Sequence, residues 1–183
     1  MIKLEYFTKE DIPQLIDWIT DELLLMNWAG SLFSFPLTTR SLEWYVEDTN
    51  VPGVSEALLY KAVDTDTAKT VGHISIGSFS EKNRSGRISR VLVGNVESKG
   101  KGICQAMARE VAGIGFEDLK LHRISLGVYD FNTAAIRCYE KAGFRKEGVQ
   151  RDILQYKEGE FWSLLEMSML EDEWRASIDA QHK

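Results

Sequence analysis

The spacing of the apolar residues changes near residue 94, and this change limits the possible folds more than any other feature of the chain. Before it, three strand-like runs are separated by short polar segments, and Asp64-Thr65-Asp66 has the composition of a turn. The three runs cover residues 57–63, 70–79 and 86–93. Their order and short connections predict a three-stranded antiparallel meander.

After residue 94, helical spacing and strand-like spacing alternate. The helical runs cover residues 103–114 and 133–142, and the strand-like runs cover residues 123–129, 144–156 and 160–170. The last two strands flank Lys157-Glu158-Gly159, which predicts a closing hairpin. A parallel crossover bracketed by antiparallel strands predicts an α/β fold: a mixed central sheet of six to seven strands with helices on both faces.

The N-terminal part of the chain adds one strand and several short helices to this prediction. Residues 1–6 alternate like a strand, residues 8–26 have the spacing of one or two helices, and a short helix follows Pro36. The chain has 183 residues, enough for one domain with a buried core, and no linker divides it. We expect a single domain over residues 1–174 and a C-terminal tail over residues 175–183.

Composition restricts location and partners. Hydrophobic residues make up 44% of the chain and charged residues 27%, and no apolar run is long enough to cross a bilayer. The N-terminus lacks the long apolar centre of a secretory signal, so we expect a cytoplasmic protein without a membrane partner. The net charge of -6 is the wrong sign for nucleic acid and weakly favours cationic acceptors such as amines.

The cysteines and histidines predict neither a disulfide nor a metal site. Cys104 and Cys138 both fall inside predicted helices and form no CxxC pair, so we expect two free thiols. The three histidines are scattered along the chain without ligand spacing. We therefore expect no metal.

A glycine-rich segment joins the third strand of the meander to the helix that begins near Ile103. Such a junction suits a pyrophosphate, because free N–H groups and the helix dipole face the anion and glycines let it approach the backbone. Lys99 and Lys101 add positive charge. The segment fits neither GxxxxGK[ST], because Gly102 follows Lys101, nor GxGxxG, because Gln105 stands at the third glycine. On this segment alone, a tight turn is at least an equal interpretation.

Residues 99–104, Lys-Gly-Lys-Gly-Ile-Cys, resemble the phosphate motif Q/R-x-x-G-x-G/A of the GNAT acetyltransferases, with Lys99 and Cys104 as conservative departures. Residues 132–144 resemble the second cofactor motif of that family. The resemblance covers residues 86–174, and its tail is similar to the branch containing ribosomal-protein N-terminal and spermidine acetyltransferases. It implies the GNAT acyl-CoA N-acyltransferase fold and acetyl-CoA as co-substrate. The cofactor contacts that it implies are Leu92, Val93, Lys99, Gly100, Lys101, Gly102, Ile103, Cys104, Asn132 and Ala135.

The second motif also has the residue spacing of one helical face. Asn132 and Tyr139 are seven residues apart, two helical turns, so they share a face with the small Ala135 between them. This face leaves room for a ligand arm, and a neutral phenol donates a proton at pH 7. The alternative is structural: Asn132 caps the helix and Tyr139 is a core aromatic residue. Asn132 can serve as cap and ligand contact together.

The resemblance implies direct transfer of an acetyl group to a primary amine, of a protein N-terminus or a small molecule. Tyr139 would protonate the departing thiolate, and a backbone N–H beside Leu92 and Val93 would stabilise the oxyanion. The base stays unassigned among Glu43, Glu56, His73, Asp130 and Glu160. Four aromatic residues either line the acceptor pocket or simply cover the sheet: Trp28, Phe33, Phe35 and Trp44.

Three further questions stay open at the level of sequence: whether the protein is an enzyme, which amine it uses, and its oligomeric state. A non-catalytic acyl-CoA-binding sensor on the same fold is the alternative to an enzyme. The amine is undetermined among a ribosomal-protein N-terminus, a polyamine, an amino acid, an aminoglycoside and other small amines. A homodimer is an open expectation, because many proteins of the resembled family dimerise.

Overall fold

A single mixed sheet forms the centre of the protein in the computed structural model, which describes residues 1–94 and 100–181. The seven strands lie in the order β1-β2-β3-β4-β5-β7-β6, and only β4 and β5 pair in parallel. The strands are β1 (Ile2–Tyr6), β2 (Ala57–Asp64), β3 (Lys69–Ser80), β4 (Ser85–Val93), β5 (Arg123–Tyr129), β6 (Arg145–Lys157) and β7 (Glu160–Leu170). The predicted meander, crossover and closing hairpin are confirmed.

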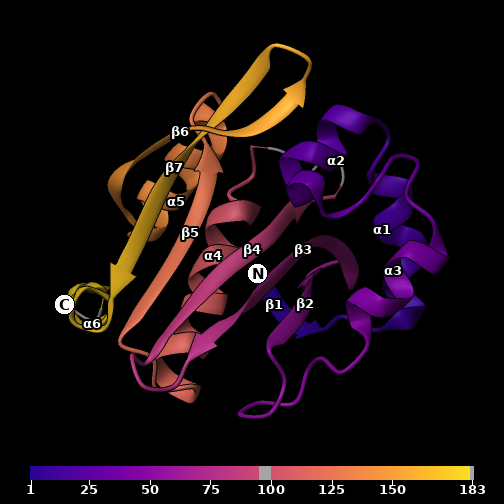
Figure 1. Ribbon diagram of the computed structural model, residues 1–183. Coiled ribbons are helices and arrows are strands. Elements are labelled where there is room, and N and C mark those ends of the chain that lie inside the picture. Colours follow the sequence, from indigo (N-terminus) through magenta and orange to yellow (C-terminus); the bar gives the residue numbers. More distant parts are fainter. Residues whose placement is uncertain (95–99, 182–183) are drawn as a thin grey trace.

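Helices cover both faces of the sheet, as predicted (Figure 1). They are η1 (Lys9–Asp11), α1 (Ile12–Trp18), α2 (Glu22–Ala29), η2 (Gly30–Leu32), α3 (Thr39–Val46), α4 (Ile103–Gly113), the π-helical turn η4 (Ile114–Asp118), α5 (Thr133–Ala142) and α6 (Glu171–Gln181). In the part of the chain that the structure describes, none of these helices is both long and apolar enough to span a membrane.

Two separate hydrophobic clusters hold the helices to the sheet. On one face, α4 and α5 contribute Met107, Val111 and Ile136 to a cluster with Ile74 and Ile124 of the strands. On the other face, the helices α1, α2 and α3 pack over the half of the sheet formed by β1 to β4 (Figure 1). Burying each of these large aliphatic side chains contributes about 1.5–3 kcal/mol to folding. The two clusters therefore fix α4 and α5 on one face and α2 on the other.

Strands β4 and β5 pair only along the first part of their length. Four residue pairs join them, from Ser85 with Arg123 to Ile88 with Leu126. Beyond these pairs β4 continues to Val93 and β5 to Tyr129 without further pairing, and the two strands fan apart (Figure 1). Each strand thus keeps an unpaired backbone edge that faces the other across an opening in the sheet.

The end of the chain differs from the expected tail. Residues 175–181 continue the helix α6, which begins at Glu171. Trp174 of this helix is buried, stacks on Phe116, and donates a hydrogen bond from Nε1 to Glu117 Oε1 over 3.0 Å. The helix is therefore packed against the core, although the extent of the domain stays a prediction.

Candidate active site

A cavity of about 240 Å³ lies where β4 and β5 separate. It is lined from both faces of the sheet: Asn132, Ala135 and Tyr139 come from the side of α5, and Trp28 and Gly30 come from α2 and η2. The remaining lining residues are Asn27, Ala29, Arg87, Ile88, Ser89, Arg90, Val91, Leu126, Gly127, Val128, Tyr129 and Leu164. The divergence of the two strands therefore leaves a cavity that residues from both faces of the sheet line.

Tyr139 is buried at this cavity, 5% exposed, and its hydroxyl makes no hydrogen bond to a described residue. Burial raises the pKa of the phenol well above its usual value of 10. The side chain is therefore neutral at pH 7 and carries a proton that no neighbouring group accepts. The ring of Tyr139 packs in the core, and the residue also borders the cavity. Its role as a proton donor stays a prediction.

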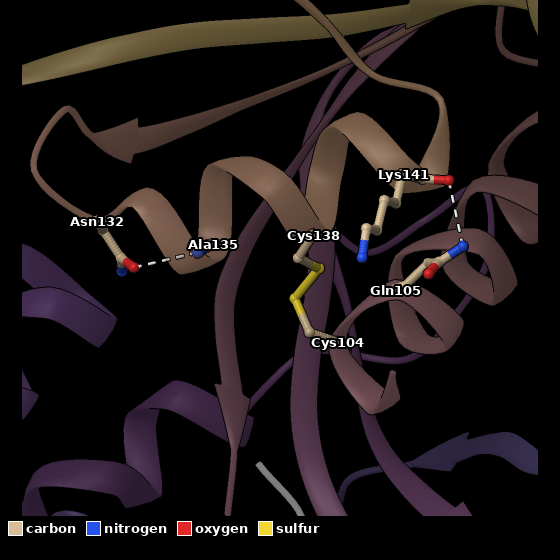
Figure 2. Close-up of a disulfide and its surroundings, with 6 residues drawn as sticks. All are labelled: Cys104, Gln105, Asn132, Ala135, Cys138 and Lys141. Carbon is tan, nitrogen blue, oxygen red and sulfur yellow. Dashed lines mark hydrogen bonds between the residues drawn. A yellow bond between two sulfur atoms is a disulfide. The ribbon is translucent and has the colours of Figure 1, made fainter. Parts of the chain in front are cut away.

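Asn132 caps α5 and also lines the cavity. Its Oδ1 accepts a hydrogen bond from Ala135 N over 3.2 Å (Figure 2). This bond satisfies one of the four N–H groups that a helix start leaves without an intrahelical partner. Gly143 ends the helix in the left-handed conformation, at φ 109°. The second motif is therefore a properly capped ten-residue helix with one face toward the cavity.

The glycine-rich segment enters α4 through two left-handed residues. Gly100 has φ 80° and Gly102, the N-cap, has φ 77°, values that favour glycine. The N–H groups of Ile103, Cys104 and Gln105 donate to no described residue, and Lys101 is exposed beside them. Free donors, a helix start and a cation fit an anionic phosphate. Lys99, the first residue of the motif, lies outside the described residues.

The expectation of two free thiols is wrong, because Cys104 and Cys138 form a disulfide (Figure 2). The bond joins the first turn of α4 to α5, with Cα atoms 6.1 Å apart. The same helices are also linked by a hydrogen bond from Gln105 Nε2 to Lys141 O, over 3.2 Å. A separation of 34 positions carries no CxxC signal, so the pairing arises only from the packing of the two helices. The first turn of α4 is thereby tied to the helix that carries Tyr139.

The predicted backbone contacts on β4 lie at its unpaired end. Leu92 and Val93 pair with His73 and Gly72 of β3, so only their edge toward β5 is open. Their side chains do not line the cavity, which is bordered by the preceding residues of β4. Their role in binding the cofactor stays a prediction.

A β-bulge shapes the part of β4 that borders the cavity. Ser89 pairs with Ser75 and Leu92 pairs with His73, so β4 has one residue more than β3 between these pairs. Arg90, within the bulge, has φ 54° in the left-handed region. Its carbonyl accepts a hydrogen bond from Trp28 Nε1 over 3.0 Å. The bulge directs Arg90 into the cavity, and nothing in the sequence pattern signalled it.

None of the five carboxylate and histidine candidates for the base lines the cavity. His73 is fully buried, and its Nε2 lies 2.9 Å from the hydroxyl of Tyr45. Burial, helped by the positive charge of Arg90, lowers the pKa of His73 from 6.5 to about 3. His73 is therefore a neutral core residue. Glu160, on β7, accepts a hydrogen bond at Oε1 from Nε1 of Trp162.

The four aromatic residues expected either to line the acceptor pocket or to cover the sheet lie in different places. Trp28 lines the cavity, whereas Phe33 is 7% exposed and stacks on Trp28 from behind. Phe35 and Trp44 are 42% and 51% exposed and lie outside the cavity lining. Only Trp28 is thus placed to touch a ligand.

Within the described residues, no group of three or more His, Cys, Asp or Glu side chains is arranged so that it could hold a metal ion. A second cavity, of about 200 Å³, lies between η4 and α6 and contains none of the predicted site residues. Three of the predicted site residues, Asn132, Ala135 and Tyr139, are brought together at the cavity between β4 and β5.

A mixed sheet that opens between two parallel strands, beside a glycine-rich helix start suited to an anion, defines the α/β class of the protein. The family is shown by comparison: residues 2–145 match the acetyltransferase (GNAT) domain. The chain therefore belongs to the GNAT acetyltransferase family.

Individual relatives agree with this assignment. The putative ribosomal N-acetyltransferase YdaF of Bacillus subtilis strain 168 is 30% identical over 132 residues, which cover 72% of this chain and 67% of that protein. The probable N-acetyltransferase YjcK of the same organism is 50% identical over 52 residues, and this match spans only 28% of this chain and 29% of YjcK.

A solved structure confirms the fold. The spermidine N-acetyltransferase of Vibrio cholerae, in complex with CoA and spermine, superimposes with a TM-score of 0.78 at 18% identity. The superposition covers 94% of this chain and 97% of that protein. The predictions of the family, the fold and the class of enzyme, an acetyltransferase, are confirmed at the level of the family.

Proposed function

We propose that this protein is an acetyl-CoA-dependent N-acetyltransferase that transfers the acetyl group directly to a primary amine of a protein N-terminus or a small molecule. One observation carries the proposal: Tyr139, a neutral phenol without a hydrogen-bond partner among the described residues, borders a cavity between β4 and β5 that is lined from both faces of the sheet. Acetyl-CoA, when bound, supplies an activated thioester carbonyl.

The residues on the side of α4 and α5 would hold the donor. The N–H groups of Ile103, Cys104 and Gln105, together with Lys101, would bind its pyrophosphate, and Lys99 and Gly100 complete the motif. Asn132 and Ala135 border the path of the ligand arm, and the open edge of Leu92 and Val93 offers backbone hydrogen bonds to it.

The role proposed for Tyr139 is that of general acid. As the amine nitrogen forms its bond to the carbonyl carbon and the carbon–sulfur bond breaks, Tyr139 gives its proton to the sulfur. The proton lost by the nitrogen returns through water to the phenolate, so that the products are an amide and a free thiol. No carboxylate lines the cavity among the described residues, so water is the proposed acceptor of the amine proton.

A thiol-release assay with acetyl-CoA and a panel of amines and N-terminal peptides tests this function. We expect Tyr139→Phe to lower kcat about a hundredfold, the low end of general-acid effects, while CoA still raises the melting temperature. Tyr156→Phe is the control, because Tyr156 lies on β6 outside the cavity lining. Equal turnover of Tyr139→Phe and the native protein would refute the general-acid role. CoA binding without thiol release from any amine would support the non-catalytic sensor instead.

A cytoplasmic location and a homodimer remain parts of the proposal. In a reducing compartment, disulfides such as Cys104–Cys138 are held mainly as dithiols. Alkylation of both cysteines in rapidly quenched cells, before lysis oxidises them, would support the location. Light scattering of the purified protein would measure the oligomeric state.

A further inference from the structure

The cavity between β4 and β5 carries one positive charge that has no ion-pair partner within residues 1–94 and 100–181. Its lining contains two arginines, Arg87 and Arg90, and no aspartate or glutamate among the described residues. Arg87 is neutralised by Glu166 of β7, with Nη2 of the arginine 2.9 Å from Oε2 of the carboxylate. Arg90 forms no ion pair and donates no hydrogen bond to any residue of 1–94 or 100–181.

The side chain of Arg90 is partly buried at the cavity. Its Nε is buried and has no hydrogen-bond partner. Burial is the main influence on the pKa values of Tyr45, His73 and Tyr129, and the charge of Arg90 acts on all three. A cation with a buried, unpartnered Nε loses part of its hydration, and an anion that hydrogen-bonds to the guanidinium offsets this cost.

The position of Arg90 places this charge on the acceptor side of the proposed reaction. On β4, Ser89 and Leu92 face the cluster formed by α1, α2 and α3, whereas Val91 packs on the opposite cluster with α4 and α5. Arg90 neighbours Tyr45 and His73, which belong to the α1–α3 side. Tyr139 borders the same cavity from the α5 side. An amine close to Tyr139 therefore has the guanidinium of Arg90 across the cavity.

We propose that Arg90 binds a carboxylate of the acceptor, and that the acceptor is a small amine that also carries an acid group, of the class of the α-amino acids. This inference rests on the proposed function and names its substrate class. A planar guanidinium matches a carboxylate with two parallel hydrogen bonds, which a neutral amide does not reproduce. A polyamine would instead bring a second ammonium group into a cavity that already holds a free cation and no lining carboxylate.

The test compares acceptors that differ only in the acid group. Thiol release from acetyl-CoA is measured with the standard L-amino acids, their carboxamides, the corresponding decarboxylated amines, and spermidine. We expect kcat/KM to be about tenfold or more higher for the acids than for their carboxamides, the size expected for a charge-assisted hydrogen bond. Arg90→Gln should abolish this difference, mainly through KM, and Arg90→Lys should retain part of it.

Arg175→Gln is the matched control, because Arg175 lies on α6 with a side chain 72% exposed. Thermal unfolding and the shift caused by CoA show that each variant is folded. Persistence of the preference for acids in Arg90→Gln, or better turnover of spermidine, would overturn the inference. So would turnover confined to N-terminal peptides with a neutral first residue.

A binding measurement separates this inference from the proposed function. Calorimetry with the same acceptors on the CoA-saturated protein should detect amino acids but not their carboxamides, and Arg90→Gln should lose this binding. Carboxylate-dependent binding without thiol release would support the inference and refute the enzyme. Thiol release without carboxylate dependence would support the enzyme and overturn the inference. The absence of binding for every acid tested would also overturn the inference.

Discussion

Arg87 on β4 and Glu166 on β7 form a two-pronged ion pair that spans the strand lying between them, β5. The side chain of Arg87 passes over Gly127, where a Cβ atom would lie 2.6 Å from its Nη2. Gly127 is itself paired with Glu166 in the sheet. Because Gly127 has no side chain, Arg87 can reach across β5 to Glu166. The ion pair thereby links β4, at one edge of the opening, to the C-terminal hairpin of β6 and β7.

Gly127→Ala should therefore destabilise the protein by about 1–3 kcal/mol, because the new methyl group displaces Arg87 from Glu166 and contacts Leu164. The free energy of unfolding is measured in urea. Gly148→Ala serves as the control, since nothing lies within 4 Å of a Cβ at that position. A loss of stability equal in the two variants would contradict the proposed reason.

Reduction of Cys104–Cys138 should lower the free energy of unfolding by about 4 kcal/mol, the chain-entropy value for a loop of this length. Urea unfolding with and without dithiothreitol measures the difference. The Cys104→Ser/Cys138→Ser variant should be insensitive to the reductant. Reaction of the folded native protein with a thiol reagent, before reduction, would show that the bond is absent.

Stability should fall in acid partly through His73. Its pKa is lowered to about 3 in the folded state, so below pH 6.5 the unfolded chain binds a proton that the folded protein does not. The contribution of His73 is lost as pH falls from 6.5 toward 3, by at most about 1.4 kcal/mol per pH unit. In His73→Gln the free energy of unfolding should depend less steeply on pH over this window.

The two roles of Asn132 can be separated by substitution. Asn132→Ala should cost about 1 kcal/mol of stability through loss of the cap on α5, whereas Asn132→Ser should retain most of it. If Asn132 also contacts the donor, both variants should raise the KM for acetyl-CoA. A raised KM in the alanine variant alone would assign the residue to capping only.

The sequence was sufficient to predict the parts of the structure that depend on local spacing. Helical and strand-like periodicity predicted the seven strands and α4 and α5, and the seven-residue interval placed Asn132 and Tyr139 on one face. The features that escaped prediction join distant residues. Cys104 meets Cys138, and Arg87 meets Glu166, only through packing that no short spacing encodes.

Arg90 escaped prediction for another reason. Its direction depends on a bulge formed by a non-glycine residue at positive φ, for which the alternating pattern of β4 gives no signal. The net charge of -6 weakly favoured cationic acceptors, yet the charge at the cavity is positive. Overall charge acts at long range through solvent, whereas Arg90 would act on a bound ligand at contact distance.

The opening between β4 and β5 has a kinetic consequence. Because the cavity is lined from two faces of the sheet, the proposed donor and acceptor would approach each other from opposite sides and occupy it together. Initial-rate plots at several fixed concentrations of acetyl-CoA should therefore intersect, as they do when both substrates are bound before either product leaves. Parallel lines would indicate a covalent acetyl-enzyme formed between two half-reactions. The two substrates would then not need to occupy the cavity at the same time.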